Sequence, residues 1–262
     1  MKIFFAGGTT HKLYRDLLYK NRVRRVLISY QNTPFTKDLV DKLSCWEEIM
    51  VDSGAFSIWM SGKKVDLDEY IQYCKKLKGT GLKFHFVNLD VIPGRYGVRP
   101  TKEEREQSAE EGWKNMEKMK KEGLNCIHVF HQHEDFKWLR KMMEFDYIGI
   151  SPANDVSLKQ KRIWLDNVFS LIKGTVKTHA FGLTDKNLML RYPWYSMDST
   201  TWFAPIRYGQ SSVGTKSLEE QGLKRRVQQH SFFACKQDIR TLLDREKLAT
   251  ELWRRRGIVW KD

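Results

Sequence analysis

Three aspartates, Asp52, Asp90 and Asp198, each stand at or just after the end of a short apolar run that is typical of a buried strand. Burying an unpaired carboxylate is costly, so each of them needs a partner or a chemical task. Two carboxylates that face one substrate suit displacement at a sugar carbon. One attacks the anomeric carbon and the other transfers the proton of the leaving or entering group, including at a glycosidic C–N bond. For each aspartate taken singly, the alternative is a structural role as a helix cap or as the partner of an arginine.

Eight short runs rich in β-branched and aromatic residues would position these carboxylates, and most of them are followed by a helical pattern. The predicted strands are Lys2–Ala6, Arg25–Tyr30, Glu48–Ala55, Phe84–Val91, Cys126–Gln132, Tyr147–Ser151, Lys177–Leu183 and Trp194–Ser199. Strands that alternate with helices in this way predict a (β/α)8 TIM barrel of the α/β class. A doubly wound open sheet is the alternative, but the Gly-rich phosphate-binding fingerprint that such sheets often carry is missing.

Helix start signals lie between the predicted strands. Residues that favour the N-cap position precede helical patterns at Asp66, Thr101, Asp135, Ser157 and Asp185. After Ser199 the pattern changes: Ala204–Gly214 is predicted as a loop, and Ser217–Trp260 as helix rich in Lys and Arg. We interpret residues 218–260 as basic helices that close the barrel, within one domain that spans residues 1–262.

A TIM barrel carries its chemistry at the carboxyl ends of its strands, so we expect the three aspartates to point toward one mouth. The segment Gly7–His11, which reads Gly-Gly-Thr-Thr-His, follows the first strand at the same mouth. Two interpretations are open for it: a backbone turn against a phosphate, or a plain turn between strand and helix, which we favour.

The residues around the aspartates resemble those of a known family. The segment Asp52–Phe56, Asp-Ser-Gly-Ala-Phe, resembles the Asp-Ser-Gly-Gly-Phe-Gln signature of the tRNA-guanine transglycosylases, with Ala55 in place of the second glycine and Ser57 in place of the glutamine. Ser196–Ser199 is similar to the nucleophile strand of that family, and Asn88–Asp90 is similar to its base-recognition segment. The resemblance spans residues 51–200 and includes three more elements in the family's order: Gln132, Gly149–Ser151 and His179–Gly182.

This resemblance implies base exchange by double displacement. Asp198 would attack C1′ of a target nucleoside, expel guanine and form a covalent Asp–glycosyl intermediate, while Asp52 would act first as general acid and then as general base. One glycosidic bond replaces another, so the resemblance implies no redox cofactor and no nucleoside triphosphate. The residues that it assigns to base binding are Ser53, Gly54, Phe56, Asp90, Gln132 and Gly149.

Two departures from the family pattern bear on the substrate. The tRNA enzymes carry zinc on a Cys-x-Cys-x-x-Cys motif and a later histidine, whereas the matching region here offers only His230 and Cys235, from which the usual site cannot be built. The chain also has no room for the additional RNA-binding domain of the archaeal members. Both departures favour the small phage-type branch that exchanges guanine in DNA for a free 7-deazaguanine base such as preQ0. The same exchange in tRNA is the alternative.

Two other classes of function compete with base exchange. His131 and His133 lie on one side of a predicted strand, and with His85, Asp90 and Asp198 they would form the metal site of a TIM-barrel hydrolase. A non-catalytic nucleic-acid-binding barrel is the third possibility, but it would not require the pair of catalytic carboxylates.

The charge balance points to a polyanionic partner. The 262 residues include 46 Lys and Arg against 32 Asp and Glu, which gives a formal net charge of +14 and favours DNA, or alternatively tRNA. We expect a basic rim around an acidic pocket, with a target base that leaves the duplex stack or lies in a single strand. For the two basic triplets, a solvated helix face is the alternative. The predicted phosphate contacts are Arg207, Lys224, Arg225, Arg226, Arg254, Arg255 and Arg256.

Composition excludes several classes of protein. A hydrophobic fraction of 41% excludes a disordered basic tail. Four scattered cysteines without a Cys-x-x-Cys pair predict free thiols in a reducing cytoplasm, which would be that of the host for a phage-encoded protein. No apolar run approaches the length of a membrane span, so no membrane partner is expected.

Overall fold

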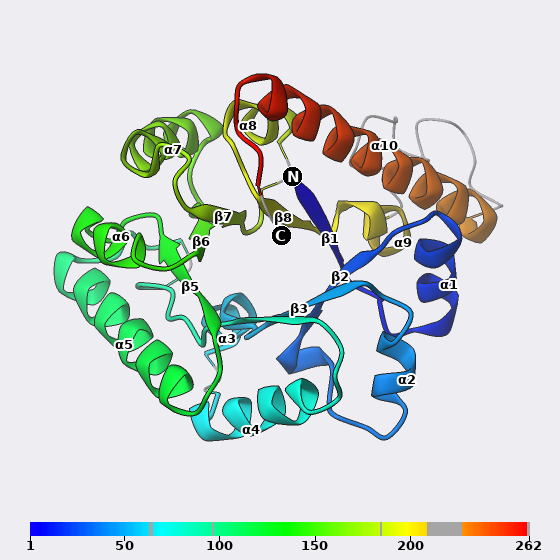
Figure 1. Ribbon diagram of the computed structural model, residues 1–262, viewed down its shortest axis with the longest axis horizontal. Helices are drawn as coiled ribbons and strands as arrows, with labels where there is room; N and C mark the ends of the chain where they lie inside the picture. The colour runs from blue at the N-terminus through cyan, green and yellow to red at the C-terminus, as the bar shows by residue number, and fades with distance from the viewer. Residues whose placement is uncertain (63–64, 96, 184, 209–226, 261–262) are drawn as a thin grey trace.

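Eight parallel strands close into a barrel, and helices connect them, as predicted for a (β/α)8 fold. The computed structural model describes residues 1–62, 65–95, 97–183, 185–208 and 227–260. Each strand pairs with the next, and β1 pairs with β8, so the sheet is closed (Figure 1). The strands are β1 (Lys2–Ala6), β2 (Arg25–Ser29), β3 (Glu48–Asp52), β4 (Phe84–Val87), β5 (Cys126–His131), β6 (Tyr147–Ser151), β7 (Lys177–Ala180) and β8 (Ser196–Ser199).

All eight predicted strands are confirmed, and they differ from the prediction mainly where they end. Strand β3 ends at Asp52, earlier than predicted, because Gly54 adopts a φ of 83° and turns the chain into a helix that begins at Ala55. Strand β4 ends at Val87, also earlier than predicted. The residues beyond both ends therefore belong to loops at the mouth of the barrel, where they are available to a site.

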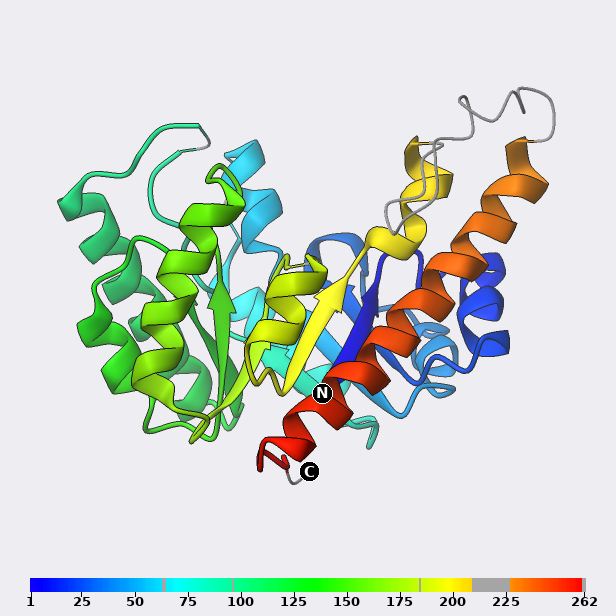
Figure 2. The same ribbon diagram turned by 90° about the horizontal axis from the view of Figure 1, so that it is seen from above.

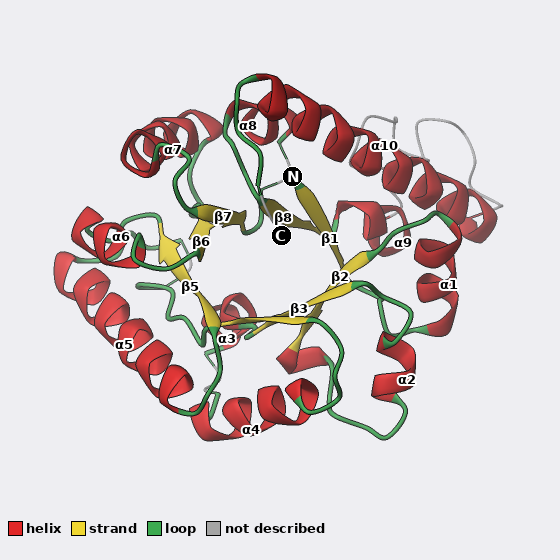
Figure 3. Cartoon of the chain, viewed as in Figure 1, coloured by secondary structure: helices red, strands yellow, loops and turns green. Residues whose placement is uncertain are grey.

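Most of the helices form a layer outside the strands, whereas α3 (Ala55–Ser61) lies at the mouth of the barrel (Figure 2, Figure 3). The helices are α1 (Lys12–Lys20), α2 (Leu39–Leu43), α3 (Ala55–Ser61), α4 (Leu67–Lys78), α5 (Lys102–Lys121), α6 (Phe136–Met142), α7 (Leu158–Ile172), α8 (Lys186–Arg191), α9 (Ala204–Tyr208) and α10 (Val227–Arg255). In the described part of the chain, no helix has the length and apolar character needed to cross a bilayer.

Side-chain caps set the start of five of these helices. The carboxylates of Asp66, Asp135 and Asp185 accept hydrogen bonds from amides in the first turns of α4, α6 and α8. Thr101 and Ser157 each form a complete capping box at the start of α5 and α7. All five predicted helix starts are therefore confirmed.

The C-terminal region differs in part from the prediction. Ala204–Tyr208 forms helix α9 where a loop was expected, because Pro205 occupies the first turn, a position where proline fits a helix well. Helix α10 confirms the predicted long helix, whereas residues 209–226 lie outside the described residues. Figure 2 shows α10 running along the side of the barrel, from the level of the mouth to the end where β1 begins.

Alternation along the strands decides which side chains fill the barrel. The apolar layer inside it includes Phe4, Met50 and Val129, and a larger apolar cluster packs between the strands and the helices. Since side chains alternate between the two faces, the residues two positions before and after an inward residue also point inward. Glu48 thus lies on the floor below Met50, and Asp52 lies at the mouth above it.

The barrel floor holds a compensated charge cluster. The Lys2 ammonium donates hydrogen bonds to Glu48 Oε1 and Oε2 at 2.8 and 3.1 Å, and His85 Nε2 lies 2.8 Å from Oε2. Burial alone would raise the pKa of Glu48, but the hydrogen bonds from His85 and Lys2, with the charges of Lys2 and Lys83, hold it well below its usual value. Glu48 is therefore ionised in the folded protein at neutral pH.

Replacing Lys2 with methionine is expected to lower the free energy of unfolding at pH 7 by about 3 kcal/mol, because it leaves a buried carboxylate without its main counter-ion. The pKa of Glu48 is lower in the folded than in the unfolded state, so its stabilising contribution is complete above about pH 4.5 and declines as the pH falls below that value. Urea denaturation from pH 3 to 8 measures both effects.

Lys42→Met is the matched control, because Lys42 pairs with Asp38 on the protein surface. Its effect on unfolding should be below about 0.5 kcal/mol. Equal losses in the two lysine variants would contradict the structural role given to the floor cluster.

Candidate active site

A cavity of about 610 Å³ opens at the mouth of the barrel. Loops that follow seven of the eight strands contribute to its wall, and both predicted catalytic carboxylates, Asp52 and Asp198, line it. Its aromatic wall includes Phe56 and Phe181, and Arg207 from α9 lies at its edge. The sequence prediction that these two aspartates share one mouth is therefore confirmed.

Asp52 is the carboxylate with the most perturbed acidity at the mouth. Its Oδ2 accepts one hydrogen bond, from the amide of Gly54 at 3.1 Å. Burial, with the negative charges of Asp90 and Asp198 adding to it, raises the pKa of Asp52 to about 7 against the weaker opposing effect of the Gly54 amide. A carboxyl group with this pKa exchanges its proton near neutral pH, which suits a general acid and base.

Asp198 is held by its Oδ1 atom. This oxygen accepts a hydrogen bond from the amide of Gly182 at 3.2 Å and lies 3.5 Å from Nε2 of the buried His179. On its other side, His179 Nδ1 lies 2.6 Å from Ser196 Oγ, which also bonds the hydroxyl of Tyr147. Within the described residues, Oδ2 of Asp198 has no hydrogen-bond partner, so this oxygen is available to a substrate.

His179 is the residue whose role the sequence left undefined. Burial lowers its pKa, and this outweighs the opposing effects of the hydrogen bond to Asp198 and of the Asp198 charge. His179 is therefore neutral at neutral pH and positions Asp198 without adding a positive charge. Strands β7 and β8 pair so that His179 lies beside Ser196, two residues before Asp198. This pairing is the signal from which the approach of His179 to Asp198 could have been predicted.

Asp90 contacts the side chains of Ser53 and His131 and does not line the main cavity. Its Oδ1 accepts a hydrogen bond from Ser53 at 3.0 Å, and His131 Nε2 lies 2.8 Å from its Oδ2. Burial lowers the pKa of His131, but the hydrogen bond and charge of Asp90 reverse the effect and raise it. The predicted base-binding residues Ser53 and Asp90 thus form a buried support beneath the site.

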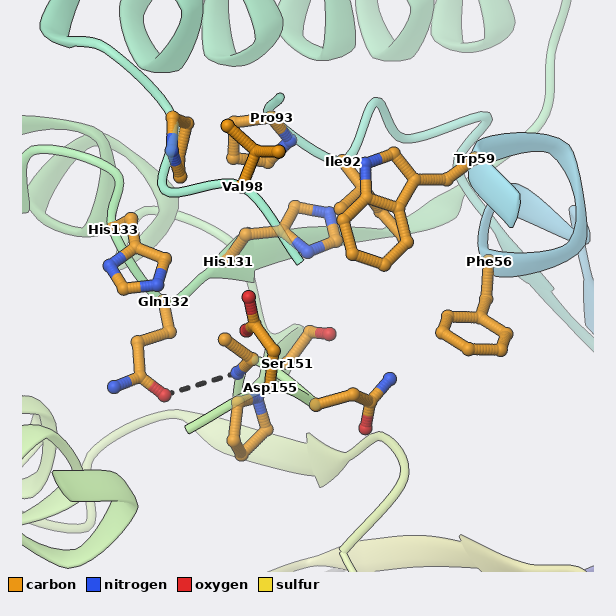
Figure 4. Close-up of a pocket in the computed structure, with 14 residues that line it drawn as sticks. Phe56, Trp59, Ile92, Pro93, Val98, His131, Gln132, His133, Ser151 and Asp155 are labelled. Carbon is orange, nitrogen blue, oxygen red and sulfur yellow. Dashed lines mark hydrogen bonds between the residues drawn. The ribbon is translucent and has the colours of Figure 1, made fainter. Parts of the chain in front are cut away.

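Gln132 and Phe56 line a second pocket that adjoins the main cavity (Figure 4). The Gln132 side chain accepts a hydrogen bond from the Ala153 amide at 3.1 Å, which holds it against the loop after β6. Trp59 and His131 complete the aromatic side of this pocket. The structure therefore places Gln132 and Phe56 on opposite sides of one pocket, and Phe56 also lines the cavity that contains Asp198.

Gly149 has a different place from the one predicted. It lies within β6, paired with strands on both sides, and does not line the cavity. A Cβ atom at this position would lie 2.5 Å from the Phe181 ring, so the glycine makes room for that ring. Phe181, which lines the cavity in its place, was not among the predicted site residues.

The basic residues divide into three groups. Arg207 lies at the mouth, as predicted, whereas Lys224, Arg225 and Arg226 lie outside the described residues. The triplet Arg254–Arg256 lies at the opposite end of the barrel: Thr250, one turn before it, bonds the N-terminal residue Met1 (Figure 2). Arg254 and Arg255 also pair with Glu251 in their own helix. The prediction of a rim that includes this triplet is therefore wrong, because α10 carries it away from the mouth.

The five residues considered for a metal site are not all brought to one place. His85 pairs with Glu48 at the barrel floor, His131 pairs with Asp90, and His133 lies in the second pocket. Among the residues that the structure describes, no three His, Cys, Asp or Glu side chains are placed to hold a metal ion. The described residues therefore do not form the metal site that a TIM-barrel hydrolase would need.

Neither the protein-family models nor the curated proteins compared with the chain give a match. The function has to be inferred from the cavity itself.

Asp52→Asn is expected to stabilise the protein at pH 8. The pKa of Asp52 is about 7 in the folded protein and near 4 when unfolded, so its ionisation weakens the folded state as the pH rises between these values. The full shift corresponds to about 4 kcal/mol, and contact with water in the open cavity reduces the expected gain to about 2 kcal/mol. Chemical denaturation at several pH values measures it.

Asp244→Asn, at an exposed site on α10, is the control and should show no comparable pH-dependent gain. A gain for Asp52→Asn that does not change between pH 4 and 8 would contradict the perturbed acidity of Asp52.

Proposed function

We propose that this protein is a DNA-guanine transglycosylase, which exchanges guanine in DNA for a free 7-deazaguanine base. The observation that carries the proposal is the pair of carboxylates in one cavity: Asp198 with a free oxygen, and Asp52 with a pKa of about 7. This pair has the two functions that displacement at a glycosidic carbon requires, a nucleophile and a proton carrier.

Asp198 is the nucleophile of the proposed reaction. The Gly182 amide donates a hydrogen bond to Oδ1 and His179 Nε2 lies 3.5 Å from the same oxygen, so Oδ2 is the oxygen available to the substrate. Oδ2 forms a bond to C1′ while the bond from C1′ to N9 of guanine breaks. The resulting glycosyl ester is then attacked by the incoming base, which restores the carboxylate, and two inversions retain the β-configuration.

Asp52 is the proton carrier. At neutral pH it is partly protonated, so it can protonate the departing guanine in the first step and take a proton from the incoming base in the second. Both steps occur at the same pocket. The proton balance closes over the cycle without any cofactor, because one glycosidic bond replaces another.

The walls of the cavity suit a purine that has left its stack. Phe56 and Phe181 provide apolar faces, and the open mouth receives a base that is flipped out or comes from a single strand. The net charge of +14 and Arg207 at the edge favour a nucleic-acid substrate. DNA is preferred over tRNA because the region after β8 lacks the cysteine motif with which the tRNA enzymes bind zinc.

Incubation with labelled guanine and either DNA or tRNA tests the proposal. Wild-type protein should incorporate label into DNA, and Asp198→Asn should lower the rate by about 10⁴-fold or more. Asp52→Asn should lower it by about 10²- to 10⁴-fold, with a smaller effect on DNA binding. Asp244→Asn serves as the control. Incorporation into tRNA alone would refute the DNA assignment, and incorporation into neither polymer would refute base exchange.

A further inference from the structure

We propose that the loop between β1 and α1, together with Arg207, binds a phosphate group of the target nucleotide. The inference rests on the proposed function for the identity of the nucleotide, but the site itself is argued from the loop. Residues Gly7–Thr10 of this loop, which spans Gly7–His11, line the same cavity as Asp198. Strand β1 pairs directly with β8, so the loop lies beside the strand that carries Asp198.

The backbone conformation of this loop depends on its two glycines. Gly7 and Gly8 have φ values of 87° and 65°, so the chain makes a tight turn at the end of β1 that glycine accommodates without strain. Within the described residues, the amides of Thr9 and Thr10 have no hydrogen-bond acceptor. A Cβ atom on Gly8 would lie 2.9 Å from the Tyr14 ring, so only glycine fits there.

Thr9 provides the observation that points to a ligand. Its side chain is only 4% exposed and lines the cavity, yet its hydroxyl has no hydrogen-bond partner in the part of the chain that the structure describes. This hydroxyl opens onto the cavity, so it is available to an acceptor or donor on a bound ligand. A phosphate oxygen in the cavity would satisfy it, along with the free amides on either side.

The start of α1 adds to the same site. Its N-cap residue, His11, makes no side-chain cap, and its first turn contains no acidic residue. The first turn of the helix therefore carries no negative charge that would repel an anion in front of it.

Arg207 supplies a second cation from the other side. Its guanidinium lies 5.5 Å from the centre of the Phe203 ring, and that ring lies 4.8 Å from the ring of Tyr14, against which Gly8 packs. This chain of aromatic contacts places α9 next to the glycine loop. A nucleotide with C1′ at Asp198 would carry its phosphate one deoxyribose ring away, and the loop after β1 lies on the strand next to β8, in the same cavity wall.

Binding of dGMP and of deoxyguanosine by isothermal titration calorimetry tests the site without any base exchange. Wild-type protein should bind dGMP about tenfold more tightly than deoxyguanosine, because charged hydrogen bonds to the phosphate are made only by the nucleotide. Thr9→Val, which keeps the shape of the side chain, should remove most of this preference. Thr241→Val, on the outside of α10, should keep it.

A second measurement uses DNA with one neutral methylphosphonate beside the target nucleotide. This change should weaken binding to wild-type protein and have little further effect on Thr9→Val, since both remove the same contact.

Equal binding of dGMP and deoxyguanosine, no binding of dGMP at millimolar concentration, or full preference in Thr9→Val would each overturn the phosphate site. A preference for dGMP that depends on Thr9, in a protein that incorporates no guanine into DNA, would support the site and refute only the proposed function.

Discussion

Repulsion between carboxylates at one mouth is the constraint around which this barrel is organised. Asp52, Asp90 and Asp198 approach closely enough for the charges of the last two to raise the pKa of the first. The surrounding residues relieve the repulsion differently at each position. His131 and Ser53 compensate Asp90, and Asp198 is stabilised through one oxygen by an amide and a neutral imidazole. At Asp52, burial and, after it, the repulsion from the other two carboxylates raise the pKa and favour the protonated form.

The two ends of the barrel shift the pKa of a carboxyl group in opposite directions. Glu48 on the floor has Lys2 and His85 as partners and remains ionised, which makes it part of the structure. Asp52, further along the same strand, has one hydrogen-bond partner among the described residues, the Gly54 amide, and an elevated pKa. Buried carboxylates that are fully paired stabilise a fold, whereas those left under-compensated cost stability and supply chemistry. The apolar layer of Phe4, Met50 and Val129 separates the two environments.

Local features were predicted well from the sequence because local interactions determine them. Strand runs follow the two-residue alternation, and the caps at Asp66 and Thr101 act within one helical turn. The gathering of Asp52 and Asp198 followed from one topological rule, that parallel strands of a barrel end at one mouth. Features that depend on packing between distant segments were missed. The Arg254–Arg256 triplet lies at the opposite end because of the length and direction of α10, and the role of Gly149 depends on the Phe181 ring from the next strand.

The central claim is that Asp198 becomes covalently bound to the sugar. The most direct measurement is peptide mass spectrometry of wild-type protein that is mixed with DNA without an incoming base and rapidly denatured. The account predicts a deoxyribose-linked adduct on the peptide that contains Asp198, together with release of free guanine. An adduct on Asp52, or guanine release with no protein-bound sugar, would contradict it.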